Sequence, residues 1–280
     1  DSRESIDMIY HLDKQIGTFI NALHKQYGTH DVCIVLTSDH GISSLTELMK
    51  DKGYTNARRI ITHDLLKRLN TSVRTHYAVD TVIQAIEDCQ VYMNLNVFQS
   101  LPAEKQQQIT DHIIAELLKE PGIKNAWVYS SLKDRCFAPD THETYYQKQF
   151  YPGRSGHIVI QPHPYCIISK WQTGTCHQTP YNYDTHVPLI LYQKEILPPA
   201  VIPNQVHSIQ LAPTLALMLD CAKPSSSLLH ALPLITEYLA KDSSQSTNQD
   251  LSKTVDPMAI CPKNSAATDL DQRYLPEPKQ

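Results

Sequence analysis

Residues 32–41 read VCIVLTSDHG, a continuous hydrophobic run followed by a group of polar residues. The run over residues 32–37 is short and rich in β-branched side chains, which is typical of a strand buried on both faces of a parallel sheet. Residues 38–41 follow where such a strand meets its outgoing loop. Because ligands bind at the carboxyl ends of strands in open α/β sheets, this segment predicts an α/β fold with a binding site after residue 37.

The regions around this segment carry both helical and strand patterns. Apolar residues at spacings of three and four predict an amphipathic helix over residues 5–27, which Gly28 ends. Hydrophobic runs predict further strands, and apolar periodicity predicts further helices. The predicted strands are residues 91–97, 127–129, 157–160 and 187–192, and the predicted helices are residues 103–119 and 208–220.

The chain divides into four predicted parts. Residues 1–60 and 151–240 form two core α/β segments, and residues 61–150 form an inserted α+β cap or subdomain between them. Residues 241–280 are rich in Ser, Asn, Gln, Asp, Lys and Pro. Such a composition buries too little apolar area to offset the entropy of ordering, so we expect a disordered tail after residue 240.

The overall composition excludes several classes of function. Of the 280 residues, 41% are hydrophobic and 19% are charged, as in ordinary soluble globular proteins. The net charge is -4 and no basic stripe is present, which argues against a nucleic-acid-binding module. No apolar run approaches the roughly 20 residues of a membrane helix. The seven cysteines are scattered singly, so neither a zinc knuckle nor a thioredoxin-like site is indicated.

Asp39 and His40 are candidate metal ligands. A carboxylate oxygen and an imidazole nitrogen both bind zinc at about 2.0–2.2 Å, and adjacent residues at a strand end can turn toward one cation. Gly41 allows the backbone to bend away sharply. By itself such a pair is more often a helix cap beside a surface histidine, so a second segment is needed to favour metal binding.

The second segment is the polar loop at residues 174–188, which reads GTCHQTPYNYDTHVP. It precedes a predicted buried strand and is rich in residues that form turns. It supplies two histidines, His177 and His186, and the carboxylate of Asp184. All three could approach the strand end that carries Asp39 and His40.

Together the two segments resemble the type I phosphodiesterase/nucleotide pyrophosphatase branch of the alkaline phosphatase superfamily. The bacterial alkaline phosphatases in that branch are the nearest match. Three more segments agree with the family in the same order along the chain. They are DSRE at residues 1–4 with LDKQI at residues 12–16, RSGHIV at residues 154–159, and HSIQLAPTLA at residues 207–216.

The resemblance implies a mostly parallel central sheet flanked by helices, with an inserted α+β subdomain and an incomplete N-terminal part. It also implies hydrolysis of a small phosphoester substrate, a monoester or a diester, at two Zn²⁺ ions and through a phosphothreonine intermediate. Asp39 and His40 would bind one ion and His177 the other, with His186 as the competing third ligand. The threonine nucleophile is expected upstream of this chain, and the location of the protein is expected to be periplasmic or secreted.

Three positions depart from the family pattern. Gln178 and Gln193 stand where glycine is usual, and His157 stands where aspartate is usual. Because of these changes and the expected missing nucleophile, we expect the chain alone to be inactive. The alternatives are a non-catalytic remnant or binding protein that retains the scaffold, and a relative of metal-dependent sulfatases or phosphoglycerate mutases. The Pro-Tyr-x-Tyr-Asp loop fits the phosphodiesterase-like branch better than the latter.

Overall fold

The computed structural model describes residues 2–139, 141–194 and 196–243. The described residues divide into two compact units, one up to Leu197 and the other from Pro198 onward. Apart from residues 241–243, the tail predicted from the composition lies outside the described residues. None of the described helices is long and apolar enough to cross a membrane.

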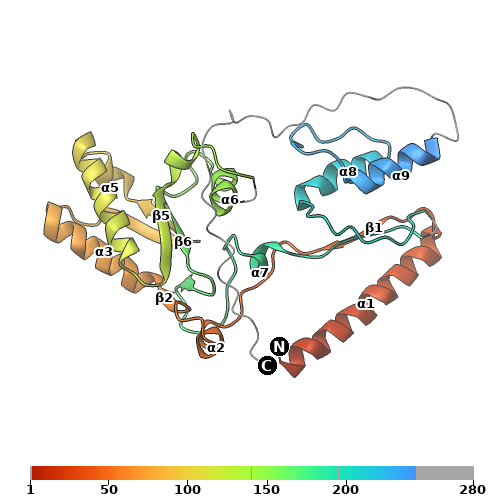
Figure 1. Cartoon of the computed structure of the whole chain (residues 1–280), viewed down its shortest axis with the longest axis horizontal. Helices are drawn as coiled ribbons and strands as arrows, with labels where there is room; N and C mark the ends of the chain where they lie inside the picture. Colours follow the sequence, from red (N-terminus) through yellow and green to blue (C-terminus); the bar gives the residue numbers. More distant parts are fainter. Residues whose placement is uncertain (1, 140, 195, 244–280) are drawn as a thin grey trace. The chain divides into compact units, whose positions relative to one another are not determined.

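The first unit is centred on a four-stranded sheet in which every neighbouring pair of strands is antiparallel. The strands lie in the order β3-β4-β6-β5, with bounds β3 Ile83–Glu87, β4 Gln90–Met93, β5 Ile123–Val128 and β6 Ile158–Pro162. Two long helices, α3 (Thr62–Tyr77) and α5 (Ala103–Leu118), contact the sheet and each other (Figure 1). Leu69, Ile113 and Ile160 are fully buried in the resulting core.

A tight turn joins β3 to β4. Asp88 and Cys89, the two residues between the strands, have φ angles of 50° and 60°. Left-handed conformations at both central residues are those of a type I′ turn, whose twist matches the twist of the flanking strands. The turn therefore fixes the antiparallel register of this hairpin, in which Glu87 faces Gln90.

The predicted strands and helices of this region are present with shifted bounds. The strand predicted at 91–97 ends at Met93 and is followed by the short helix α4 (Leu95–Phe98). The strand β6 lies beyond the predicted end of the subdomain at residue 150 but completes the same sheet. The remaining elements are short: α2 Thr46–Asp51, β2 Arg59–Ile61, η1 Tyr129–Leu132, α6 His142–Gln149, β7 Ile167–Ser169 and α7 Asn182–Thr185.

The hydrophobic run that predicted the fold forms β1 (Ile34–Thr37), whose one partner strand within the described residues is β8 (Leu189–Tyr192). The pair is antiparallel, and its side chains are half-buried or exposed. Among the described residues the only parallel pair is β2 with β7. The mostly parallel central sheet predicted from the sequence is therefore not found there, because a β-branched run specifies a strand but not the direction of its neighbour.

The predicted N-terminal helix is α1 (Arg3–Tyr27). The hydroxyl of Ser2 accepts a hydrogen bond from the amide of Ser5 and caps its start, and Gly28 ends it with a φ of 89°. No residue of α1 is buried. The helix bounds therefore follow from local signals, without a buried face.

The second unit contains η2 (Ser208–Gln210), α8 (Leu211–Met218) and α9 (Pro233–Ser243). The side chains of His207 and Gln210 form a capping box at the start of the first of these helices. Thr214 on α8 accepts a hydrogen bond at 2.9 Å from the amide of Leu232, just before α9. The helix predicted at residues 208–220 is therefore present as a short 3₁₀ turn continued by α8.

Candidate functional site

The polar residues after β1 are held against the loop that precedes β8. The amide of Gly41 donates a hydrogen bond to the carbonyl oxygen of Asp184 at 2.7 Å. A Cβ atom at position 41 would lie 2.1 Å from the carbonyl oxygen of Tyr183, far inside van der Waals contact. Glycine is therefore required here by the close approach of two backbones, whereas the sequence had suggested a sharp bend.

Two further hydrogen bonds join the same segments. The amide of Ser43 donates to the carbonyl of Cys176 at 3.0 Å, and the hydroxyl of Thr175 donates to the carbonyl of Ser43. The exit of β1 and the loop at residues 174–188 thus lie side by side, although 132 positions separate Thr175 from Ser43 in the sequence.

This arrangement brings the predicted metal ligands together. The rings of His40 and His177 stack with 3.4 Å between their centroids and 11° between their planes. Asp39 Oδ2 lies 3.6 Å from His40 Nε2. His186, the competing candidate, is exposed at the C-terminal end of α7, where its amide bonds to the carbonyl of Asn182.

The hydrogen bonds of His40 define which ring nitrogen is available. Nδ1 lies 2.7 Å from the carbonyl oxygen of Gly41, and because a carbonyl only accepts, Nδ1 carries the proton. Nε2 then presents a lone pair toward Asp39 Oδ2. Two lone pairs repel, so this geometry suits either a proton on Nε2 or a cation between the two atoms.

The carboxylate of Asp39 is accessible and ionised. Its side chain is 84% exposed, and that of His40 is 38% exposed. The pKa of Asp39 is lowered by attraction to the His40 ring and by the hydrogen bond that Oδ1 accepts from the His40 amide at 3.0 Å. Both groups therefore face open space with their ligand atoms available.

These donors fit zinc in kind but do not complete a site. Imidazole nitrogen and carboxylate oxygen are ordinary zinc ligands, and structural or catalytic sites use three or four of them. Within residues 2–139, 141–194 and 196–243, no group of three or more His, Cys, Asp or Glu residues is arranged to hold a metal ion. The chain thus offers a pair of stacked imidazoles and one carboxylate rather than a closed coordination shell.

Asp184 stabilises the loop that carries His177. It is 4% exposed, and its Oδ2 accepts hydrogen bonds from the amide and the hydroxyl of Thr179, at 2.9 and 2.6 Å. Its other oxygen, Oδ1, is buried with no hydrogen-bond partner among the described residues. The sequence marked this aspartate only as a group that could converge on the site, and the bonds to Thr179 show that it also orders the loop.

The two tyrosines of the same loop attach it to the segment after β6. The hydroxyl of Tyr181 donates to the carbonyl of Pro162 at 2.7 Å, and the amide of Tyr165 donates to the hydroxyl of Tyr183 at 3.1 Å. The rings of Tyr165 and Tyr183 stack with centroids 4.9 Å apart. Burial raises the pKa of Tyr183 to about 12, so its hydroxyl stays protonated at neutral pH.

Gln178, directly after His177, adopts a strained backbone conformation. Its φ angle is 99°, in a region that glycine occupies freely and other residues rarely adopt. Its side-chain amide donates to Oδ1 of Asp88 in the β3–β4 turn. The glycine expected at this position from the family pattern thus has a conformational reason, and this chain keeps the conformation without the glycine.

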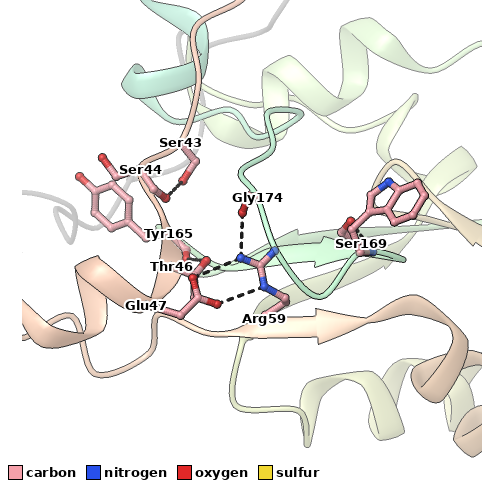
Figure 2. A network of polar contacts seen from close by, with 9 residues as sticks. Ser43, Ser44, Thr46, Glu47, Arg59, Tyr165, Ser169 and Gly174 are labelled. Atoms are coloured by element: carbon pink, nitrogen blue, oxygen red, sulfur yellow. Dashed lines mark hydrogen bonds and ion pairs between the residues drawn. The ribbon is translucent and has the colours of Figure 1, made fainter. Parts of the chain in front are cut away.

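A half-buried arginine holds the start of the loop, and nothing in the sequence pattern indicated it. Arg59 on β2 donates to the carbonyl of Gly174 at 2.8 Å and pairs with both carboxylate oxygens of Glu47 on α2, at 3.1 and 3.2 Å (Figure 2). Bidentate pairing fixes the guanidinium plane. Arg59 therefore positions the loop without contacting the candidate ligands.

A small cavity has His177 among its lining residues. Three cysteines, Cys89, Cys166 and Cys176, are among its lining residues. Burial raises the pKa of all three thiols, that of Cys89 to about 12. They are therefore protonated at neutral pH and poor nucleophiles or metal ligands as they stand.

The sequence profile of the type I phosphodiesterase/nucleotide pyrophosphatase family matches residues 1–186. The chain belongs to this family. Among curated relatives in its wider group, alkaline phosphatase PafA of Elizabethkingia meningoseptica is 24% identical over 228 residues, which are 81% of this chain and 41% of that protein. A protein of Myroides odoratus named calcium-transporting ATPase is 25% identical over 230 residues, with the same two shares.

Solved structures show the fold of this family member. A crystal structure of a PafA mutant matches with a TM-score of 0.72 at 23% identity, over 82% of this chain and 43% of the matched one. Wild-type PafA matches with a TM-score of 0.70 at 22% identity, over 79% and 41%. The chain thus spans about two-fifths of the length of the relatives it matches.

Proposed function

We propose that this chain contributes part of a two-zinc site to a phosphoester hydrolase. Asp39 and His40 would hold one Zn²⁺ and His177 the other, and the substrate would be a small phosphomonoester or phosphodiester. Family membership implies a phosphoester hydrolase ancestry. The observation that carries the proposal further is the stacking of His40 on His177, with Nε2 of His40 facing Asp39 at 3.6 Å.

The residues of the chain would act by holding and orienting ligands. The hydrogen bond from His40 Nδ1 to the Gly41 carbonyl fixes the ring so that Nε2 is the nitrogen that would bind the metal ion. Gly41 keeps the Asp39–His40 pair against the loop, and Asp184 orders the part of the loop that follows His177. When bound, paired zinc ions would stabilise the charge of the attacking and leaving oxygens.

The proposal assigns the nucleophile and the remaining ligands to polypeptide outside residues 1–280. Three candidate ligands divided between two ions leave each ion short of its usual protein ligands. On this basis the chain alone has no phosphatase activity. A periplasmic or secreted location is proposed with the function.

Zinc binding by the purified chain tests the ligand assignment directly. We expect calorimetric titration to show weak zinc binding that His40→Ala and His177→Ala each abolish. His186→Ala is the matched control and should leave the affinity within twofold. If His186→Ala lowered the zinc affinity as much as His177→Ala, His186 would be assigned as a ligand. If none of the three variants changed the zinc affinity, the proposed site would be wrong.

A second candidate function is a non-catalytic protein that retains the scaffold. The strained Gln178 in place of glycine favours it, as does the lack of a closed shell of metal ligands in the part of the chain that the structure describes. Assays with p-nitrophenyl phosphate and bis-p-nitrophenyl phosphate separate the two candidates. They require the chain together with a polypeptide that supplies the part of the fold it does not span. Zinc-dependent turnover lost in Asp39→Ala supports the hydrolase, and no turnover with zinc bound supports the scaffold.

A further inference from the structure

Three cysteine side chains from distant parts of the sequence meet at the small cavity that His177 helps to line. They are Cys89 in the β3–β4 turn, Cys166 just before β7 and Cys176 in the loop at residues 174–188. All three are free thiols, and Cys176 is the most accessible of them because it is only half-buried. The fold therefore gathers three oxidisable sulfur atoms beside a candidate metal ligand.

A hydrogen bond joins the two segments that carry Cys89 and Cys176. The side-chain amide of Gln178 donates to Oδ1 of Asp88. Asp88 directly precedes Cys89, and Gln178 follows two residues after Cys176. Burial and the nearby Cys176 thiol raise the pKa of Cys89 to about 12, in agreement with this close approach. The turn and the loop are thus held together at the point where both cysteines lie.

The position of Cys89 is not explained by the turn that contains it. Its φ angle is 60°, at the second central position of a type I′ turn, where glycine is the preferred residue. Its side chain is nevertheless 5% exposed, so it is turned into the protein. The local backbone gives no reason for a cysteine here, and the reason lies in what its sulfur atom faces.

The third cysteine of the cavity is engaged elsewhere. The thiol of Cys166 donates to the carbonyl of Asn56 at 2.8 Å, which holds it toward the segment before β2. The thiol of Cys176 donates only within its own loop, to the carbonyl of His177 at 3.2 Å. Rotation of the Cys176 side chain therefore breaks no contact with another segment. These contacts favour Cys89 and Cys176 as the reactive pair.

We infer that Cys89 and Cys176 are a redox-sensitive pair that closes into a disulfide when the protein meets hydrogen peroxide. The more accessible sulfur, that of Cys176, attacks the peroxide: the O–O bond breaks, an S–O bond forms, and one water leaves a sulfenic acid behind. The sulfur of Cys89 then attacks this sulfur atom. An S–S bond forms, the S–O bond breaks, and the oxygen leaves as a second water with the thiol proton. Two thiols are oxidised and one peroxide is reduced to two waters.

The bridge would act on the loop that carries His177. Cys176 directly precedes this histidine, and its sulfur loses the proton that it donates to the His177 carbonyl. A covalent bond would then hold the start of the loop to the β3–β4 turn, where a single side-chain hydrogen bond from Gln178 joins them now. Oxidation would therefore restrict the backbone around His177. This inference does not depend on zinc binding.

Tryptic mapping of the oxidised 280-residue chain identifies which thiols react. Cleavage after lysine and arginine places the three cysteines on separate peptides, residues 75–105, 155–170 and 171–194. We expect peroxide treatment of the folded chain to link the first of these peptides to the third, and reduction to release them. Because burial raises the pKa of both thiols, an excess of peroxide is used. Amide exchange over residues 174–179 should slow in the oxidised chain.

Three variants and one condition control the assignment. Cys89→Ser and Cys176→Ser should each abolish the linked peptide, whereas Cys166→Ser, from the same cavity, should leave its yield unchanged. Far-UV circular dichroism shows whether each variant folds. The same oxidation in urea removes the arrangement of the folded chain, so the selective link should be lost there.

The outcomes that would overturn the pair are distinct from those that bear on the proposed function. They are a main product that contains the peptide of residues 155–170, a linked yield in the folded chain no higher than in urea, and no link at all under excess peroxide. Each of these can occur whether or not the chain binds zinc. Loss of zinc binding with the disulfide still formed would refute the proposed function and leave the redox pair standing.

Discussion

The four-stranded sheet and the β1–β8 ladder are built from similar hydrophobic runs but differ in what covers them. The sheet is packed against α3 and α5, and Ile113 on α5 is 0% exposed. The ladder is accompanied by α1, in which Ile9 is 66% exposed. The same kind of apolar side chain therefore has a different energetic role in the two regions. A hydrophobic pattern indicates which face will be covered, not whether the cover is present.

A matched pair of substitutions gives the largest expected difference. Ile113→Ala should lower the free energy of unfolding by about 2–5 kcal/mol, because it leaves a cavity in the core. Ile9→Ala should change it by no more than about 0.5 kcal/mol, because the side chain is already in water. Urea denaturation of both variants measures the contrast. A cost for Ile9→Ala close to that of Ile113→Ala would mean that the free chain covers α1 in solution.

A pair of glycine substitutions probes where the ladder region is tightly packed. Gly41→Ala should destabilise the chain by about 1–3 kcal/mol, because the new Cβ would meet the Tyr183 carbonyl oxygen. Gly17→Ala, within α1, has nothing within 4 Å of its Cβ and should stabilise the helix by up to about 1 kcal/mol. Thermal unfolding followed by circular dichroism compares the two. Equal and small effects would show that the backbones near Gly41 separate easily.

Gln178→Gly examines the strain in the loop that joins the two regions. Relief of the positive φ should stabilise the chain by about 1 kcal/mol, less the hydrogen bond to Asp88 that is lost. Gln178→Ala removes the same hydrogen bond and keeps the strain, so it should be the less stable of the two variants. The urea concentrations at the midpoints of unfolding show which of the two variants is more stable. If the alanine variant is as stable as the glycine variant, the conformation is not strained.

The smallest expected effect is on how the stability of the chain depends on pH, through a histidine directly before β6 of the four-stranded sheet. Burial lowers the pKa of His157, whose Nδ1 accepts a hydrogen bond from the amide of Met93 at 3.2 Å. The unfolded chain therefore takes up the proton first, and stability falls as the pH drops below the ordinary value of 6.5. We expect a lower melting temperature at pH 5.5 than at pH 7.5. The His157→Asn variant keeps an acceptor that does not titrate, and an undiminished pH dependence there would exclude His157 as the cause.

The local features of the fold were predictable from the sequence, but the pairing of the strands was not. The helix ending at Gly28 and the turn residues before Val187 follow from short-range patterns. The direction of β8 beside β1 depends on the path of the chain between the two strands, which neither strand encodes. In the site, the proximity of His177 to His40 is as expected from the two motifs, whereas the role of Arg59 depends on a contact with Gly174, 115 positions away. The assignment of Asp39, His40 and His177 as zinc ligands stays a prediction.

The hydrogen bond between Thr175 and Ser43 spans 132 positions. All four strands of the four-stranded sheet lie between these two residues in the sequence. Closing so long a loop is entropically costly until the intervening chain is compact. During synthesis, Asp39 and His40 leave the ribosome long before His177, so the two histidines can meet only after the residues between them have been made. We therefore expect the stacking of their rings to be a late step in folding, so that a probe of this contact would report when folding of the unit is complete.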